Sequence, residues 1–558
     1  GDGIYNTTST TNIVKVGNIA GNFINNTRSA INNSFSTLDD SNMTLGSISG
    51  NFIGNKSSAI KNQMGATYGS SSDPENSTLS IGDIKGHFLS NSTNSSGGAI
   101  YNYISRVSDF SNIKIGNITG DFVGNTATDD GGAIYMNNLS NTSKYSPEPI
   151  VATINIGDIN GNFINNNAGR YGGAIYSYAS VGDNIIGDIT GNFIGNTASQ
   201  AGGAIYMNQY GRVSKIGDIK GDFKNNYVKS TSSFAAGGAI YGGYIKSITG
   251  DFVNNYVEGK LTGEAAGEAY GGAIYGTSFD SINGNFIGNY AKANATAYGG
   301  AIYNTGYIDK LTGDFENNYA EAQDSRGGAI YNDKSYINLV NSSFVNNKSG
   351  TMGGAIYTMD GSNETIGDGG GAVGSLSINE DDNLPDNPDY YTYVKNLDIS
   401  STLFKDNSSG IGGAIASELT NNLTIYTGGA EPPEENSVTL YSNDAQPEYK
   451  EISINIENSS FQNNKAVLDG GAISINKVDK ITIYAGNYEP AQPNSLALNN
   501  EISLLDNFSE DYYTPVEPEF KNYDLVIKDS EFTGNTAARG GAISFNYNKF
   551  DVNIMDTP

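Results

Sequence analysis

Cysteine and tryptophan are absent from this chain of 558 residues, and histidine occurs only once. Without cysteine the chain has no disulfide, no thiolate zinc site and no cysteine nucleophile. The single histidine, His87, stands directly before a phenylalanine, a place that Asn51, Asp121 and Asn162 fill before other phenylalanines. We therefore interpret His87 as an exposed strand residue, which leaves a Ser-His-Asp arrangement without its base.

Positive charge is also scarce, with 31 Lys and Arg against 59 Asp and Glu and a formal net charge of −28. Phosphate backbones and anionic membranes both attract basic surfaces, so this balance argues against binding to nucleic acid or to a lipid surface. No run of about 18 apolar residues occurs, so we expect no helix that spans a membrane. No basic-then-apolar segment precedes Gly1, which we interpret as a mature form or an excised segment.

What the chain does contain is a repeat. Twelve copies of Gly-Gly-Ala-Ile recur, each eight to nineteen residues after a Phe-x-x-Asn motif. The first complete pair joins Phe88–Asn91 with Gly97–Ile100, and two earlier motifs, Phe23–Asn26 and Phe52–Asn55, precede weaker copies. The chain therefore holds about fourteen units, and a period of 20–50 residues predicts a solenoid or a propeller.

The spacing of the phenylalanines gives the size of one unit. Phe163, Phe193, Phe223 and Phe252 are 30, 30 and 29 residues apart. Before each phenylalanine, apolar and polar residues alternate with the period of two that is typical of β-strands. We therefore predict an all-β fold, a single-stranded parallel β-helix of about 14 coils of about 29 residues each.

The residue after each phenylalanine indicates which side faces the core. It is Ile164 or Val253 in some units but Lys224 or Glu316 in others. A position that accepts charge lies outside, so the phenylalanines are predicted to point inward and to stack at about 4.8 Å.

The other repeated residues are predicted to be architectural. The asparagine of each motif falls at a bend, where it tolerates left-handed backbone angles, and equivalent asparagines can bond one another in a ladder. The glycine pair suits a sharp turn where a Cβ would clash. We assign these structural roles to Phe163, Asn166, Gly172, Gly173, Phe193, Asn196, Gly202, Gly203, Phe344, Asn347, Gly353 and Gly354.

Phe-x-x-Asn followed by Gly-Gly-Ala-Ile, many times over, resembles the passenger region of the chlamydial polymorphic outer-membrane proteins, and more broadly autotransporter-type β-helix passengers of Gram-negative bacteria. The paired motifs span residues 88–543, with weaker copies over 23–60. The resemblance implies a right-handed β-helix that is displayed on the cell surface, acts in adhesion and is followed by an outer-membrane barrel. No barrel is recognisable in this chain, so we expect it to be tethered through a separate one.

The regular spacing ends late in the chain. One continuous solenoid is predicted, with regular coils over 1–360 and long insertions at 361–395, 427–450 and 485–520 within 361–558. Each insertion follows a Gly-Gly-Ala-Ile strand and precedes the next phenylalanine, so the three are expected on one side of the rod. Tyrosines on loops that also contain proline provide amphipathic contact area, although such insertions also drift freely in solenoids. The candidate binding residues are Tyr390, Tyr391, Tyr393, Tyr441, Tyr449, Tyr488, Tyr512 and Tyr513.

A second candidate surface is a tyrosine stripe. Tyrosine follows most of the Gly-Gly-Ala-Ile motifs and is expected to face outward, where it would stack on sugar rings, cover a partner or merely shield the sheet. The stripe consists of Tyr135, Tyr176, Tyr206, Tyr241, Tyr275, Tyr303, Tyr331 and Tyr357.

The recurring carboxylates suggest two kinds of chemistry. Paired carboxylates carry out glycoside hydrolysis, but Asp158, Asp188 and Asp218 repeat at one position, whereas a catalytic pair needs two different environments. Stacked carboxylates also suit Ca²⁺, as does the acidic run 380–382, although Asn117 and Ser247 interrupt the columns. We predict no catalytic residue, no cofactor and no dedicated metal site, with Ca²⁺ left open.

The sequence thus favours an extracellular, bacterial cell-surface protein of the outer-membrane-associated kind. We expect an adhesin or rigid stalk that binds a protein or glycan on a host or neighbouring cell, without catalysis, and we leave self-association open. Two other classes remain: a polysaccharide-degrading β-helix enzyme, and a structural subunit that assembles end to end.

Overall fold

The computed structural model describes most of the N-terminal two thirds of the chain and shorter stretches after it. The described residues are 2–8, 13–35, 41–65, 77–105, 111–139, 152–180, 182–208, 214–263, 266–333, 335–340, 342–359, 396–400, 403–418, 422–426, 453–457, 460–476, 480–483, 524–527, 531–545 and 551–553. Throughout this part of the chain every regular element is a β-strand.

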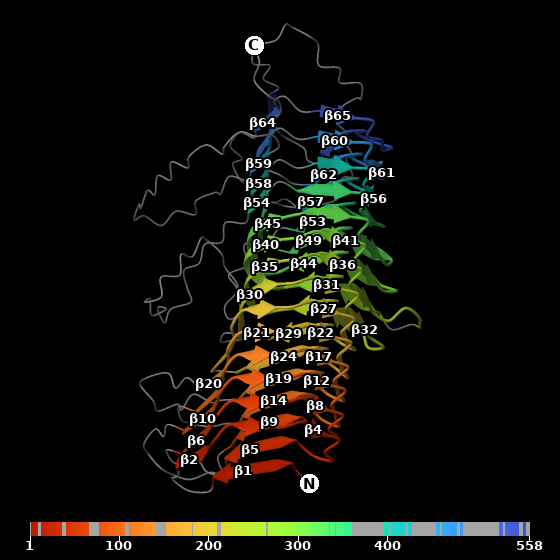
Figure 1. The fold of residues 1–558 in the computed structure, drawn as a ribbon. Helices are drawn as coiled ribbons and strands as arrows, with labels where there is room; N and C mark the ends of the chain where they lie inside the picture. The colour runs from red at the N-terminus through yellow and green to blue at the C-terminus, as the bar shows by residue number, and fades with distance from the viewer. Residues whose placement is uncertain are drawn as a thin grey trace, which may run out of the picture.

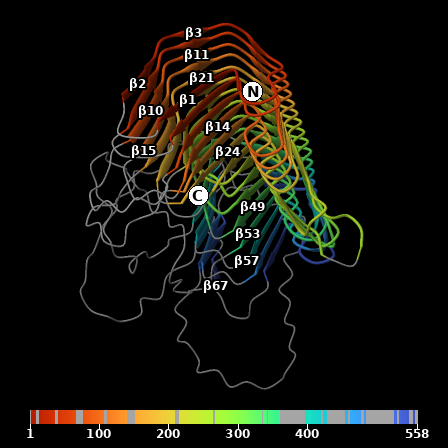
Figure 2. The same cartoon turned by 90° about the horizontal axis from the view of Figure 1, so that it is seen from below.

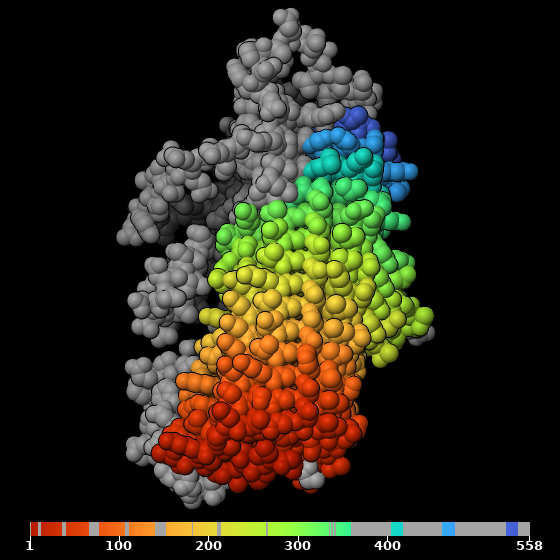
Figure 3. Space-filling view, in the orientation of Figure 1, coloured from red at the N-terminus to blue at the C-terminus, as the bar shows by residue number. Residues whose placement is uncertain are grey.

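The strands form a parallel β-helix, as the sequence predicts. The chain winds in stacked coils from β1 (Ile4–Thr8) at one end to β65 (Glu531–Thr533) near the other (Figure 1). Seen along the rod, successive coils lie over one another (Figure 2), and each forms one band of the surface (Figure 3). All pairings between neighbouring coils are parallel, which gives the molecule one direction along its length.

One coil contains five short strands. We name the stacked sheets A to D. In the coil of Phe163, β20 (Thr153–Ile156) and β21 (Ile159–Asn160) belong to sheet B, and β22 (Phe163–Ile164) belongs to sheet C. The next strand, β23 (Asn167–Ala168), belongs to sheet D, and β24 (Ile175–Ala179) belongs to sheet A, after which the next coil begins. Sheet C has 14 strands and sheet A has 15, so the predicted count of about fourteen coils is confirmed.

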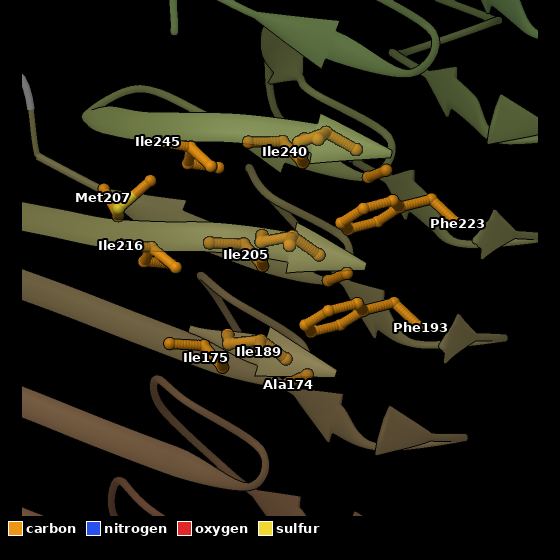
Figure 4. Close-up of a cluster of buried hydrophobic side chains, with 14 of the residues drawn as sticks. Ala174, Ile175, Ile189, Phe193, Ile205, Met207, Ile216, Phe223, Ile240 and Ile245 are labelled. Atoms are coloured by element: carbon orange, nitrogen blue, oxygen red, sulfur yellow. The ribbon is translucent and has the colours of Figure 1, made fainter. Parts of the chain in front are cut away.

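The phenylalanines form a continuous column in the core. Phe163 and Phe193 are fully buried, and their rings stack with centroids 4.7 Å apart and planes inclined by 2°. The column continues through every neighbouring coil from Phe23 to Phe532 with centroid separations of 4.6–5.3 Å. Isoleucines of sheets A and B, such as Ile175 and Ile189, fill the rest of the interior (Figure 4). Because each ring fits only between its two neighbours, the column sets the register of the whole stack.

Inside the bend after each phenylalanine runs a ladder of buried asparagines. The Nδ2 of Asn166 donates to Oδ1 of Asn196 at 3.0 Å and to the carbonyl of Phe122 at 2.9 Å. Its own Oδ1 accepts bonds from the backbone N–H and the Nδ2 of Asn125. Every polar atom of this buried side chain therefore has a partner, which a buried amide requires.

The left-handed residue of the bend lies one position earlier than the sequence suggested. Asn165, not Asn166, has a positive φ of 53°, and Gly195 has one of 63° in the next coil. Asn166 instead directs its amide inward to the ladder. The second residue after the phenylalanine therefore makes the tight turn, and Asn or Gly at this position tolerates left-handed angles.

The glycine pair makes the second turn. Gly172 has φ of 64°, and a Cβ added to Gly173 would lie 2.1 Å from the carbonyl oxygen of Gly203 in the next coil. The first glycine of the pair thus supplies a left-handed angle, and the second leaves room for the neighbouring backbone. Gly353 and Gly354 repeat this geometry against Gly413.

The late coils add strands to sheet B that the sequence did not reveal. Between Phe404 and Phe461, both β58 (Asn422–Tyr426) and β59 (Ser453–Glu457) join this sheet, side by side. The insertion 427–450 connects these two strands, whereas 361–395 connects sheet A with sheet B. All three insertions lie outside the described residues, so their predicted grouping on one side stays a prediction.

Candidate functional site

The tyrosines expected to contact a partner from the late insertions lie outside the described residues. These are Tyr390, Tyr391, Tyr393, Tyr441, Tyr449, Tyr488, Tyr512 and Tyr513. Their assignment as binding residues stays a prediction, and the sites described below belong to the regular coils.

The tyrosine stripe of sheet A exists, but most of its surface is covered. Its rings form a ladder from Tyr101 to Tyr357 with centroid separations of 4.8–5.2 Å between neighbouring coils. The side chains stand outside the main core, yet Tyr331 is only 2% exposed and Tyr357 is fully buried. The expectation of an outward-facing, accessible stripe is therefore wrong at this end of the ladder.

The cover comes from the residue that precedes each glycine pair. Tyr298 stacks on Tyr331 of the next coil at 4.6 Å, and Arg326 lies 5.1 Å from the ring centroid of Tyr357 while donating to its hydroxyl at 2.7 Å. These residues make a second layer over the ladder, and the layer changes from coil to coil. The repeat alone did not reveal it because only the tyrosine after Gly-Gly-Ala-Ile recurs regularly.

This packing limits what the tyrosine ladder can bind. A sugar ring stacks on the face of an aromatic ring, but both faces of Tyr206 or Tyr241 already contact neighbouring tyrosines. Burial also raises the pKa of Tyr303 far above its usual value, and its hydroxyl donates to Asp333 at 2.7 Å. The ladder therefore shields sheet A, and does not offer ring faces to a ligand.

The repeated carboxylates also have structural partners. Oδ1 of Asp158 accepts the backbone N–H of Asp188 at 2.9 Å, and Oδ1 of Asp188 accepts that of Asp218 at 2.8 Å. The column that contains His87 follows the same rule, because Nδ1 of His87 accepts the backbone N–H of Asp121 at 3.0 Å. Each side chain thus satisfies a backbone donor of the next coil at an exposed bend.

Within the part of the chain that the structure describes, no three His, Asp or Glu side chains gather in a way that could hold a metal ion. The acidic run 380–382 lies outside that part, so Ca²⁺ binding there stays a prediction.

One buried carboxylate does not belong to these columns. Asp130, beside the glycine pair of its coil, is only 4% exposed. Its Oδ2 accepts a hydrogen bond from Arg170 at 2.8 Å, while its buried Oδ1 has no partner. Burial raises its pKa to about 6, although Arg170 acts in the opposite direction and Asp129 adds to the rise.

Four coils in the middle of the rod carry a projection that the sequence analysis missed, which we call the ridge. Its sheet D strands are β32 (Tyr227–Lys229), β37 (Tyr256–Glu258), β42 (Tyr290–Lys292) and β47 (Tyr319–Glu321). A separate four-stranded sheet returns the chain, formed by β33 (Phe234–Ala236), β38 (Glu268–Tyr270), β43 (Thr296–Tyr298) and β48 (Asp324–Arg326). The edge that contains β32 is labelled at the right of Figure 1.

The ridge has a small core of its own. Val228, Val257 and Ala291 of sheet D pack against Ala235 and Ala269 of the returning sheet, apart from the main core. A signal for it was present, because the segment between Phe-x-x-Asn and Gly-Gly-Ala-Ile lengthens in these four units. Each longer segment begins with Tyr, a small apolar residue and a charged residue, which is a strand pattern of period two.

The outer face of the ridge holds two regular columns. Tyr227, Tyr256, Tyr290 and Tyr319 stack at 4.8–4.9 Å and remain half-buried. Two residues further along each strand, the charges alternate in register as Lys229, Glu258, Lys292 and Glu321. Within the chain, Lys229 pairs with Glu258 at 2.8 Å and Lys292 with Glu321 at 2.9 Å.

Comparison with known proteins gives one result that bears on identity. Residues 120–137, 341–359 and 458–476 each match the Chlamydia polymorphic membrane protein repeat. Each matched segment contains one Phe-x-x-Asn motif and one glycine pair, which supports the resemblance to the passenger region of that family. No curated protein and no solved structure matches the chain. Among the described residues there is no helix long and apolar enough to cross a membrane.

Proposed function

We propose that this chain is a surface-displayed passenger that acts as an adhesin, holding ligand-binding loops away from the cell on a rigid β-helical rod. The observation that carries the proposal is the match of three segments to the Chlamydia polymorphic membrane protein repeat, in a chain that repeats the same pair of motifs over residues 88–543. The extracellular, outer-membrane-associated location and the tether through a separate barrel rest on the same resemblance.

The architecture suits a spacer. Fourteen strands of sheet C at about 4.8 Å per coil make a rod on the order of 65 Å long. The asparagine ladder and the phenylalanine column cross every coil boundary, so the rod resists bending at each step. A ligand bound near one end would therefore be held at a constant distance from the other end.

Catalysis is not part of the proposal. A glycosidase requires two carboxylates with different acidities on either side of a bond. The repeated aspartates, such as Asp158 and Asp188, instead accept backbone N–H groups of the neighbouring coil at exposed bends. This use of the carboxylates supports a structural role for them, and the ligand that we propose is a cell-surface protein or glycan.

The test is saturable binding of residues 1–558 to epithelial cells and to a glycan array. A variant with 361–395, 427–450 and 485–520 trimmed should lose binding if the late insertions hold the receptor site. A control variant shortened within 140–151 removes a segment between sheets A and B elsewhere on the rod and should bind as the parent does. Circular dichroism and the unfolding temperature of each variant check that the coils persist. Absence of binding by the parent chain would contradict the adhesin proposal.

A further inference from the structure

The charge pattern along the ridge is complementary to its own reverse. Along the rod its charged column reads Lys229, Glu258, Lys292, Glu321. Read from the other end, the same column begins with Glu and ends with Lys, so every position meets the opposite sign. A surface that complements its own reverse is what a symmetric pair of identical subunits requires.

We propose that the ridge is the contact surface for a second copy of this chain, with the two rods antiparallel. A two-fold axis perpendicular to the rod places each column against the same column in reverse order. Lys229 then faces the Glu321 position of the other copy, and Glu258 faces the Lys292 position. The alternative axis, parallel to the rod, keeps every residue level with its own equivalent, so Lys meets Lys and Glu meets Glu.

The two most exposed charges of the column stand at its ends. The side chains of Lys229 and Glu321 are 60% and 58% exposed, whereas that of Glu258 is 16% exposed. In the antiparallel pair the exposed ends meet each other twice, once at each end of the contact. The internal pairs, Lys229 with Glu258 and Lys292 with Glu321, would become parts of a network that crosses the interface.

The tyrosine column supplies the apolar part of the contact. Side chains two apart on a strand share a face, so Tyr227 lies beside Lys229 on the outer side, opposite the buried Val228. The tyrosine faces are stacked, but their edges remain half-exposed along four coils. Tyrosine edges bury apolar area and retain a hydroxyl for bonding, which is why tyrosine is common in protein interfaces.

The neighbouring strands of sheet C carry a second column whose charge pattern is complementary to its own reverse. In the same four coils the residues after the phenylalanines are Lys224, Val253, Ile287 and Glu316, all at least partly exposed. Read backwards, this column also places Glu where Lys stood and keeps the two apolar residues in the middle. Both columns therefore place opposite charges together when one copy is reversed, and their strands are separated by only two residues in the chain. Agreement between two columns favours the antiparallel contact over a chance alternation of charge.

The contact is small, so we expect weak dimerisation. Four rungs make an interface at the low end of the size range for specific complexes, and a dissociation constant of about 10–100 µM is expected. Attachment of many copies to one surface, or of copies on two facing surfaces, raises their effective concentration and favours pairing. The antiparallel geometry fits rods that extend toward each other from facing surfaces.

Sedimentation velocity of residues 1–558 between about 1 and 200 µM tests the proposal. The mean mass is expected to rise toward twice the monomer value, and less so in high salt, because exposed charge pairs are screened. Lys229→Glu alone, or Glu321→Lys alone, places like charges at both ends of the contact and should keep the chain monomeric. An equimolar mixture of the two variants restores opposite charges at every rung, and should dimerise at least as well as the parent.

Lys246→Glu is the matched control. Lys246 lies in sheet B away from the ridge, is 59% exposed and has one acidic partner, Asp218, at 3.5 Å. It therefore undergoes the same change of charge as Lys229→Glu in a similar environment and should leave dimerisation unchanged.

Cross-linking reports the orientation. Because the chain has no cysteine, Lys229→Cys and Glu321→Cys each introduce a unique thiol. A mixture of the two variants under mild oxidation should give mainly the mixed disulfide dimer. A parent chain that remains monomeric at all concentrations, single charge reversals without effect, or disulfides formed mainly between two residues 229 would each overturn the proposal.

Discussion

Asn196 bonds both of its neighbouring coils through one side chain. Its Nδ2 donates to Oδ1 of Asn226 at 2.9 Å and to the carbonyl of Phe163 at 2.8 Å, and its Oδ1 accepts from Asn166. The same arrangement recurs at every step from Asn26 to Asn535. The ladder therefore links the coils from Asn26 to Asn535 through amides that are buried from Asn55 onward.

Replacing Asn196 with alanine should destabilise the protein by about 2–4 kcal/mol, because it leaves a buried amide donor and a buried carbonyl without partners. The effect is measured by urea unfolding followed by circular dichroism. Asn192→Ala is the control, since Asn192 is only half-buried and its side chain accepts one backbone N–H, that of Asp222, at 2.8 Å. Equal losses for the two variants would contradict the importance given to burial.

Gly173→Ala should cost about 2–4 kcal/mol or prevent a soluble fold, because the new Cβ would lie 2.1 Å from the carbonyl oxygen of Gly203. The backbone on both sides is fixed by the stack and cannot move away. Gly17→Ala is the matched control, because no atom lies within 4 Å of its added Cβ. Thermal unfolding of the two variants should differ clearly, and a neutral Gly173→Ala would show that neighbouring coils can separate locally.

Asp130 should make the stability depend on pH in an unusual direction. Burial raises its folded-state pKa to about 6, above the ordinary value of about 3.8, so the folded protein binds this proton more tightly than the unfolded chain. The stabilising contribution is complete below about pH 4 and is lost as the pH rises through 6.

The variant Asp130→Asn, which resembles the protonated form, should therefore gain unfolding temperature relative to the parent at pH 7.5 and show little gain at pH 4. Differential scanning calorimetry at both pH values measures the difference. Asp188→Asn removes a carboxylate from an exposed bend, where it accepts one backbone N–H, and serves as the control. A change of Asp130→Asn that is the same at both pH values would contradict the raised pKa.

Removal of one whole coil should leave the rest folded. Deleting residues 164–193 joins Phe163 to Ile194 and removes one complete repeat of 30 residues. Since each coil contacts mainly its two neighbours, the stacks close over the gap, and the unfolding temperature should fall by only a few degrees. Deletion of half that length, residues 164–178, would interrupt the phenylalanine column and the asparagine ladder, and should abolish cooperative unfolding.

The sequence by itself determined the architecture of this protein. Alternating residues before Phe193, and the tolerance of Lys224 and Glu316 after the phenylalanine, were enough to predict strands with phenylalanine inside. The recurrence of one motif then predicted the number of coils and the stacking of equivalent residues in successive coils. These inferences succeed because a solenoid repeats one local environment, so a residue type that recurs at one position reports what that position requires.

Only the tertiary structure decided which residues are covered and which surfaces are free. The left-handed angle belongs to Asn165 and not to Asn166, because the buried ladder holds the latter. Tyr357 is buried because Arg326 of the preceding coil lies over it. The repeat could not predict this contact, because an arginine does not recur at that position. The ridge likewise depends on four successive coils lengthening together, since one arch alone could not bury Val228. Coverage and exposure are set by what the adjacent coil contributes, and that depends on residues that do not repeat.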